Sequence, residues 1–235
     1  MTQFPKILFL IAPSESKNTK NEKNLTENLS FHFSKPKEIA ENTTEKDLKC
    51  SGKRYDEAML LNLTNGNTGV LDAISRYNGV QFKHLDYENL SHEGQKYIDE
   101  NILILSGMYG IVRPKDFISN YKLPIEVRGL YDFWGNQIAE KIIEEKPDYI
   151  INLLPKSYEK LLKIRKNLAT FQSQNIKILN IIFVSQNGEK FSHNTKILRG
   201  KFLKNIAENA RENIFDVLQF EDNEEIVQEI LVPIE

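Results

Sequence analysis

The sequence of 235 residues contains one cysteine, one tryptophan and only four histidines. The single cysteine, Cys50, excludes a disulfide within the chain, a CxxC redox motif and a cysteine-bound metal cluster. The histidines show no i,i+3 or i,i+4 pairing and no HExxH motif, so we expect no metal site and no cofactor. No apolar run approaches the ~18 residues of a transmembrane helix, so we expect no membrane partner.

The first residues lack the basic start, the long apolar core and the small-residue cleavage site of a signal peptide. The apolar segment nearest the start, 7–12, is only six residues long. We therefore expect a cytoplasmic protein. Its length suits one domain over 1–235, and the sequence contains no internal repeat and no linker that would divide it. We also expect a monomer.

Charge is unevenly distributed along the chain, although the net charge is only -2. Residues 153–204 contain eleven Lys or Arg and two acidic residues, whereas the tail 219–235 contains six acidic residues and no basic one. A basic stretch of this kind can face an anionic partner. The alternative is that its lysines form the solvent-exposed face of a helix, in particular Lys156, Lys160, Lys163 and Lys166.

Apolar runs alternate with segments of helical periodicity, which predicts a mixed α/β domain with a central, partly parallel sheet flanked by helices. Strands are predicted at 7–12, 102–105, 149–154 and 176–184, with an edge strand at 229–234. Helices are predicted at 36–41, 54–63, 68–77, 91–100, 130–145 and 155–168, and the final one has an apolar stripe from 202 to 218. The polar residues 14–54 are interpreted as a solvent-exposed excursion of the same domain.

The segment 102–116 is the richest candidate for a functional site. An apolar strand runs directly into Ser106 and Gly107, and ligands of open α/β sheets gather where strands end. The glycines let backbone N–H groups approach an anion, and Arg113 can hold a phosphate or carboxylate with two hydrogen bonds. The alternative is a structural turn with an internal Arg113–Asp116 ion pair. The segment contains neither GxGxxG nor a Walker A motif.

Further candidates lie near other predicted strand ends or at the start of the final helix. The candidates for binding DNA or another anion are Lys17, Ser106, Gly107, Tyr109, Gly110, Arg113, Lys196, Arg199, Gly200 and Lys201. The candidates for lining a pocket are Ser14, Asp116, Tyr121, Trp134, Asn152 and Tyr158. No catalytic residue is assigned. We expect Lys17, Arg113 and Arg199 to meet in a single cationic recess at the carboxyl edge of the sheet.

Taken together, these motifs resemble the signature of the YaaA family of bacterial peroxide-stress proteins, in order and approximate spacing from residue 7 to about 213. The matching segments are 14–17, 105–116, 121–123, 130–135, 151–153 with Tyr158, and 196–200. The chain differs from the family pattern at three places. His84 stands at a family glycine, Leu154 and Pro155 replace Ala-Ser, and 18–50 matches poorly.

The resemblance implies a cytoplasmic protein of the response to hydrogen peroxide that limits free iron, and so Fenton damage to DNA. It also implies an α/β fold with a positively charged cleft and a helix-hairpin-helix-like element that binds DNA. Residues 105–110 are the candidate for that element, although their glycines are three residues apart and the usual turn places them two apart.

Two functions of different classes are therefore expected. The first is binding of double-stranded or distorted DNA through phosphate contacts, without sequence preference. The second is an enzyme that acts on a nucleoside, a nucleotide or a related small anion. An elongated basic groove would favour nucleic acid, whereas a small closed pocket would favour the enzyme. A third hypothesis is a protein-interaction role for the acidic tail.

Overall fold

The structure is a computed structural model. It describes residues 5–21, 25–67, 69–185, 188–191, 194–209, 218 and 227–233. Outside this range lie most of the second half of the predicted apolar stripe 202–218 and the acidic stretch 221–225.

A six-stranded sheet forms the centre of the molecule, in the strand order β4-β3-β1-β6-β7-β8. Its strands are β1 (Ile7–Ile11), β3 (Ile102–Ser106), β4 (Gly110–Val112), β6 (Tyr149–Asn152), β7 (Lys177–Val184) and β8 (Val227–Pro233). All neighbours are parallel except β3 and β4, which pair antiparallel. A second sheet pairs β2 (Val70–Asp72) antiparallel with β5 (Phe117–Ser119). The predicted mixed α/β class with a partly parallel sheet is confirmed.

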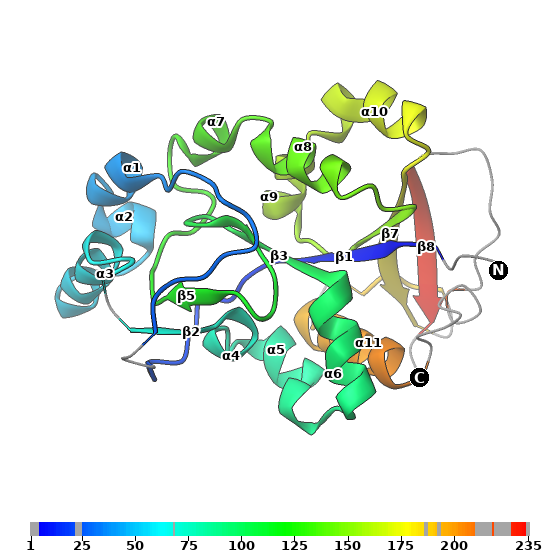
Figure 1. Cartoon of the computed structure of the whole chain (residues 1–235), viewed down its shortest axis with the longest axis horizontal. Coiled ribbons are helices and arrows are strands. Elements are labelled where there is room, and N and C mark those ends of the chain that lie inside the picture. Colours follow the sequence, from blue (N-terminus) through cyan, green and yellow to red (C-terminus); the bar gives the residue numbers. More distant parts are fainter. Residues whose placement is uncertain are drawn as a thin grey trace.

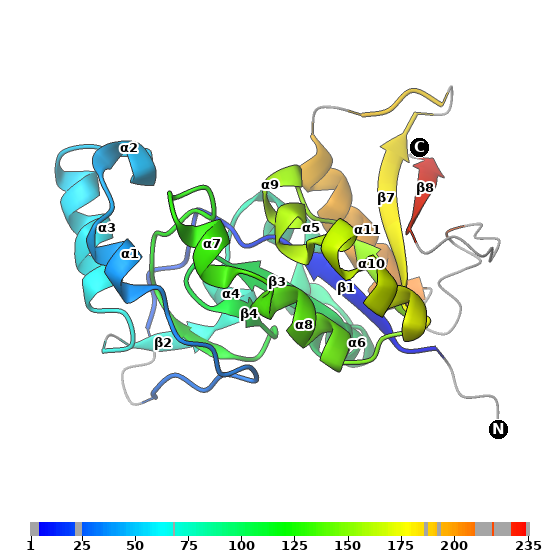
Figure 2. The ribbon, with the colours of Figure 1, turned by 90° about the horizontal axis from the view of Figure 1, so that it is seen from above.

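Helices cover both faces of the six-stranded sheet (Figures 1 and 2). One face carries α7 (Leu130–Trp134), α8 (Gln137–Glu144), α9 (Lys156–Glu159) and α10 (Ile164–Ser173). The other face carries α5 (Val80–Leu85), α6 (His92–Asn101) and α11 (Thr195–Asn209). At one end of the molecule, beyond the small sheet, lie α1 (Lys37–Glu41), α2 (Glu45–Leu48) and α3 (Lys53–Leu63), and α4 (Ala73–Arg76) follows β2.

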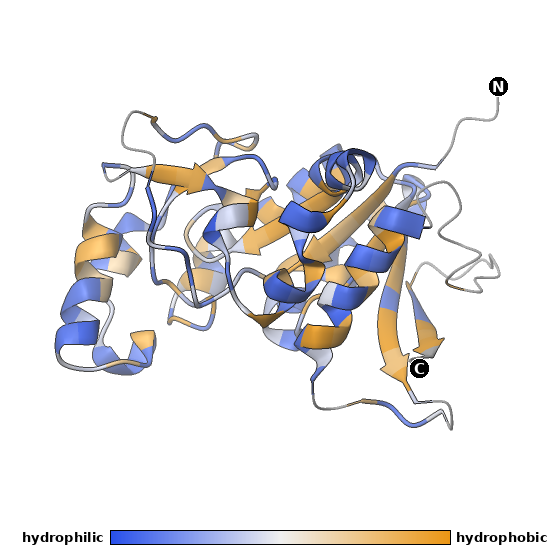
Figure 3. Cartoon of the chain, turned by 90° about the horizontal axis from the view of Figure 1, so that it is seen from below, coloured by the Kyte–Doolittle hydropathy of each residue, from blue (hydrophilic) through white to orange (hydrophobic). Residues whose placement is uncertain are grey.

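The core lies between these layers, and it explains why the central strands are apolar throughout. Every residue of β1 and of β3 is buried, as expected for parallel strands with helices on both faces. Figure 3 shows the strands of this sheet mainly in the colour of hydrophobic residues, whereas the surrounding helices alternate between the two colours. None of the described helices is both long and apolar enough to cross a bilayer.

Three predicted helices differ from the structure. The helix expected over 130–145 is divided into α7 and α8 at Gly135, whose positive φ of 49° is one that glycine adopts easily. The helix expected over 155–168 is divided at Lys163, which also has a positive φ. Residues 70–76 of the helix expected at 68–77 form β2 and then α4, because Val70 and its neighbours pair with β5. Helix α5 was not predicted.

The segment proposed as a helix-hairpin-helix-like element is a different structure. Residues 106–110 form the turn between the antiparallel strands β3 and β4, with Ser106 opposite Gly110. Gly110 has a φ of 72°, and a Cβ on Gly107 would lie 2.3 Å from the carbonyl oxygen of Leu123. These glycines therefore serve a tight turn packed against the chain, and the placement of a helix-hairpin-helix-like element here is wrong.

Candidate functional site

A pocket of about 450 Å³ opens beside the carboxyl ends of β1 and β6. Its walls come from five parts of the chain that are far apart in sequence. They are the loop after β1, the beginning of α5, the loop before α7, the beginning of α9 and the first turn of α11. Ligands of open α/β sheets bind at this edge, so the position agrees with the expected strand-end site.

Lys17 is the central charged residue of the pocket wall. Its Nζ donates a hydrogen bond to the carbonyl oxygen of Ser14 at 2.9 Å and lies 4.2 Å from the ring centroid of Tyr121. None of the ion pairs found among the described residues includes Lys17. Burial of the ammonium end lowers the pKa of Lys17 to about 7, and the charges of Lys122 and Arg76 add to the effect, against Glu15.

A buried chain of hydroxyl groups lies beside this lysine. The Tyr121 hydroxyl is 2.8 Å from the Tyr77 hydroxyl and 2.8 Å from Ser106 Oγ. Burial raises the pKa of Tyr121 to about 12 and that of Tyr77 well above its usual range. These groups therefore stay protonated near neutral pH. We call Lys17, Tyr77, Ser106 and Tyr121 the Lys17 cluster.

Three more cations line the same pocket. Arg199, half-buried on α11, donates a 3.4 Å hydrogen bond to the carbonyl oxygen of Leu154, and burial lowers its pKa. Lys196 is exposed one turn earlier on α11, and Lys122 is half-buried beside Tyr121. Acidic lining residues are also present, namely Glu15 and Glu126. Four basic residues thus face two acidic ones, which favours an anionic ligand.

Gln81 adds an unusual polar group to the wall. It is 7% exposed, and its Nε2 has no hydrogen-bond partner among the described residues. A buried donor without an acceptor is costly, and this atom is itself covered by protein and not open to the pocket. Gly200 holds α11 against this segment, because a Cβ at position 200 would lie 2.3 Å from the carbonyl oxygen of Gln81.

The structure brings together six of the candidates named from the sequence: Ser14, Lys17, Tyr121, Tyr158, Lys196 and Arg199. Two neighbours of this set stay outside the lining. Gly200 is a helix contact, and Lys201 is exposed on α11. The lysines of 156–166 are divided between α9, a 3-10 turn and α10, and three of the four are exposed.

Arg113 does not join the recess, and that part of the prediction is wrong. Its guanidinium forms an ion pair with Glu145 at 2.8 Å and a hydrogen bond with the carbonyl oxygen of Glu100. Glu145 also binds Lys6, which precedes β1, so this group lies at the amino edge of the sheet. The reason is the turn at 107–109, which sends β4 back antiparallel to β3.

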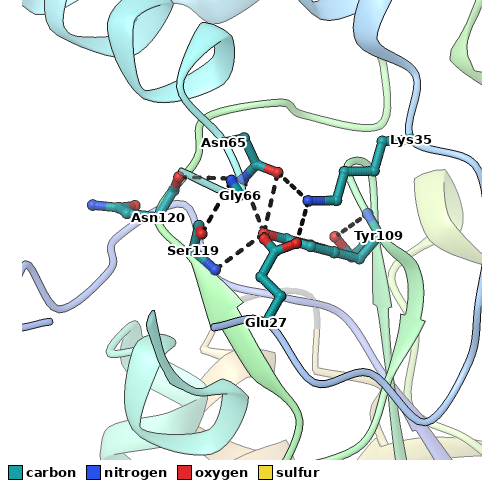
Figure 4. Close-up of polar contacts among 8 residues, drawn as sticks. Glu27, Lys35, Asn65, Gly66, Tyr109, Ser119 and Asn120 are labelled. Atoms are coloured by element: carbon teal, nitrogen blue, oxygen red, sulfur yellow. Dashed lines mark hydrogen bonds and ion pairs between the residues drawn. The ribbon is translucent and has the colours of Figure 1, made fainter. Parts of the chain in front are cut away.

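Tyr109 belongs to a separate polar group, shown in Figure 4. Its hydroxyl donates to Glu27 at 2.5 Å and accepts from Asn65 at 2.9 Å. Lys35 Nζ lies 2.6 Å from a carboxylate oxygen of Glu27 and 2.6 Å from Asn65 Oδ1, over the ring of Tyr109. We call Glu27, Lys35, Asn65 and Tyr109 the Lys35 cluster. It ties the polar excursion to the core.

The remaining candidates have structural partners. Asp116 accepts hydrogen bonds from the backbone N–H groups of Ser30 and Arg113, which replaces the alternative of an Arg113–Asp116 side-chain pair. Trp134 is fully buried and donates to the carbonyl oxygen of Gly107. Asn152 donates to Asn180 and accepts from the N–H of Leu154. None of these residues lines the pocket.

Sequence reasoning did not identify Gln81, Lys122, Glu15 or Glu126 as lining residues. Lys122 could have been predicted as a lining residue, since it directly follows Tyr121, which was a pocket candidate. Gln81 had none, because α5 is six residues long and too short to show a helical period.

Comparison with known proteins gives a consistent result. A family profile described as peroxide stress protein YaaA matches residues 7–227. A UPF0246 protein of Clostridioides difficile is 30% identical over 231 residues, which cover 90% of this chain and 91% of the relative. A UPF0246 protein of Lachnoclostridium phytofermentans is 29% identical over 167 residues, covering 67% of this chain and 63% of the relative, less than two thirds of its length.

Proposed function

Because the chain belongs to the peroxide stress protein YaaA family, we propose that it acts in the cytoplasmic response to hydrogen peroxide by binding a phosphate-bearing ligand of nucleotide size. The binding site is the pocket at the ends of β1 and β6. The observation that carries this proposal is the convergence of Lys17 and Arg199, neither in an ion pair among the described residues, on one small cavity.

The size and the chemistry of the pocket agree with such a ligand. Its volume of about 450 Å³ lies within the range of about 300–1,000 Å³ that is common for small-molecule sites. Arg199 offers a planar set of donors suited to phosphate, and Lys196 adds a second charge at the rim. Val80 and Pro155 line the wall and give it an apolar part against which a base can pack.

Nucleotide binding is tested by thermal shift and calorimetry with a panel of nucleoside monophosphates, the matching nucleosides and inorganic phosphate. We expect the phosphorylated compounds to stabilise the protein more than the nucleosides do. Arg199→Met removes a charged donor and should weaken binding by about 10-fold or more. Arg165→Met, which changes an exposed arginine outside the pocket, is the matched control. Equal binding by the two variants would contradict the proposal.

DNA binding is the second candidate, and one observation favours it. Exposed lysines stand on two helices that line the pocket, on α9 at Lys156 and on α11 at Lys196 and Lys201. A DNA backbone lying across this rim would place one nucleotide over the pocket. In this form of the proposal the protein protects DNA in cells under peroxide and helps to limit free iron, as the family resemblance implies.

Fluorescence anisotropy with double-stranded and branched DNA at several salt concentrations tests this candidate. Each phosphate neutralised should contribute about 0.9 to the slope of log affinity against log salt for duplex DNA. Lys156→Gln combined with Lys201→Gln should lower that slope by about two units while nucleotide binding persists. Affinity independent of salt would exclude this mode of binding.

A further inference from the structure

The Lys17 amine differs from that of Lys35, which is also half-buried. Lys35 binds a carboxylate at 2.6 Å, whereas the hydrogen bond given for Lys17 Nζ goes to a backbone carbonyl oxygen. Lys17 is held in place by its own backbone, which bridges to Tyr77, and by Asn18, whose N–H donates to the Arg76 carbonyl oxygen at 2.8 Å. The amine is therefore fixed, enclosed and part of a pocket wall.

The surroundings of Lys17 keep a large share of the amine unprotonated near neutral pH. Burial is the main cause, and the positive charges of Lys122 and Arg76 act in the same direction, while Glu15 opposes them. The neighbouring hydroxyls of Tyr77 and Tyr121 are protonated and carry no charge that would hold the proton on Lys17. A desolvated, unprotonated lysine is the form that attacks carbonyl carbon.

The pocket also offers groups for the rest of such a ligand. Arg199 and Lys196 suit a phosphate, and the Lys17 amine suits the carbon of a carbonyl group. A short phosphorylated carbon chain with an aldehyde or ketone group satisfies all three. Such a ligand is much smaller than the pocket volume of about 450 Å³, so water can occupy the rest of the pocket.

We propose that the Lys17 amine forms an imine with the carbonyl group of a phosphorylated aldehyde or ketone bound in this pocket. The inference rests on the proposed function, since the same cations hold the phosphate. The amine nitrogen adds to the carbonyl carbon, and one of its two hydrogens moves to the carbonyl oxygen. The resulting hydroxyl takes up the second amine hydrogen and leaves as one molecule of water, while the nitrogen lone pair completes the C=N bond. Glu15 lines the same pocket and its charge acts on Lys17, so we assign the relay of these protons to its carboxyl group. No oxidant or reductant takes part.

Reductive trapping tests the inference directly. The protein is incubated with D-glyceraldehyde 3-phosphate and cyanoborohydride, which reduces an imine to a stable amine, and the modified lysine is located by peptide mass spectrometry. We expect Lys17 to be labelled at least about 10-fold faster than the exposed Lys201, because an amine is reactive only when unprotonated. Lys17→Arg should abolish that label without affecting the others, and Arg199→Met should slow it.

Two comparisons separate this inference from the proposed function. If nucleotides stabilise the protein but Lys17 is labelled no faster than Lys201, the imine proposal is overturned and the binding proposal stands. The other outcome is that glyceraldehyde without phosphate labels Lys17 as fast as the phosphorylated compound and that nucleotides do not bind. In that case the proposed phosphate site is overturned, and so is the proposal that the carbonyl compound is phosphorylated. Thermal unfolding of Lys17→Arg confirms that loss of label does not reflect loss of fold.

Discussion

The Lys17 cluster and the Lys35 cluster each contain a lysine over a tyrosine ring and differ in the partners of the lysine amine. In each, a lysine lies over a tyrosine ring, with Nζ 4.2 Å from Tyr121 in one case and 4.6 Å from Tyr109 in the other. Lys35 has a carboxylate and an amide oxygen as partners (Figure 4). Lys17 has a backbone carbonyl oxygen and a pocket.

This difference separates a structural role from a binding role. A buried charge with its partners in place contributes to a defined fold, whereas one without a counter-charge lowers stability until something binds it. Glu27 shows the closed case. Burial would raise the pKa of its carboxyl group, but hydrogen bonds from Lys35 and Tyr109 hold that pKa below its usual value. Lys17 shows the open case, and its environment suits an incoming anion or carbonyl group.

The largest loss of stability is expected from breaking the closed cluster. Glu27→Gln keeps the shape but removes the charge, so Lys35 is left partly buried without an anion. We expect the free energy of unfolding to fall by about 2–3 kcal/mol, somewhat below the range for a fully buried pair. Urea unfolding measures this change. Adding Lys35→Met should recover part of the loss. If Glu27→Gln alone is as stable as the wild type, the Glu27–Lys35 ion pair does not stabilise the fold.

The open cluster should respond in the opposite direction. The unfolded chain holds the Lys17 proton up to its ordinary pKa of 10.5, whereas the folded chain releases it at about 7. The unfolded state therefore binds more protons between these values, and the free energy of unfolding rises with pH across this window. Lys17→Met should remove this contribution to the rise and make the protein more stable at neutral and lower pH.

Thermal unfolding at about pH 6.5 and about pH 9 measures this contribution. The two proteins should differ more at the lower pH, and Lys201→Met is the control for loss of an exposed lysine. A variant with the same pH dependence as the wild type would show that Lys17 keeps an ordinary pKa. Ligand binding should still be weaker in Lys17→Met, although its fold is more stable.

Much of the fold was predictable because the central strands carry their own signal. The apolar runs at β1 and β3 are short and buried on both faces, and this pattern indicates a strand without further context. The missed breaks at Gly135 and Lys163 depend on backbone angles, which the apolar periodicity does not reveal. Helix α5 is too short for any period to show.

The candidate site was predicted in part for a related reason. Lys17, Tyr158 and Arg199 lie near strand ends or at the start of a helix, so their meeting followed from the topology of a parallel sheet. Arg113 was misplaced although the sequence contained the necessary signal. Only three residues separate β3 from β4, and parallel strands need a connection of a dozen or more. A residue beyond such a turn returns to the opposite edge of the sheet.

The smallest effect is expected at Arg113, which sharpens the comparison because it is a cation with a closed set of partners. Arg113→Met removes a partly exposed ion pair with Glu145, and Lys6 remains to bind that carboxylate. We expect a loss of about 1 kcal/mol or less in the free energy of unfolding, smaller at high salt. Nucleotide affinity and labelling of Lys17 should not change. If Arg113→Met weakened nucleotide binding as much as Arg199→Met does, the presence of an anionic partner would not distinguish a structural cation from a ligand-binding one.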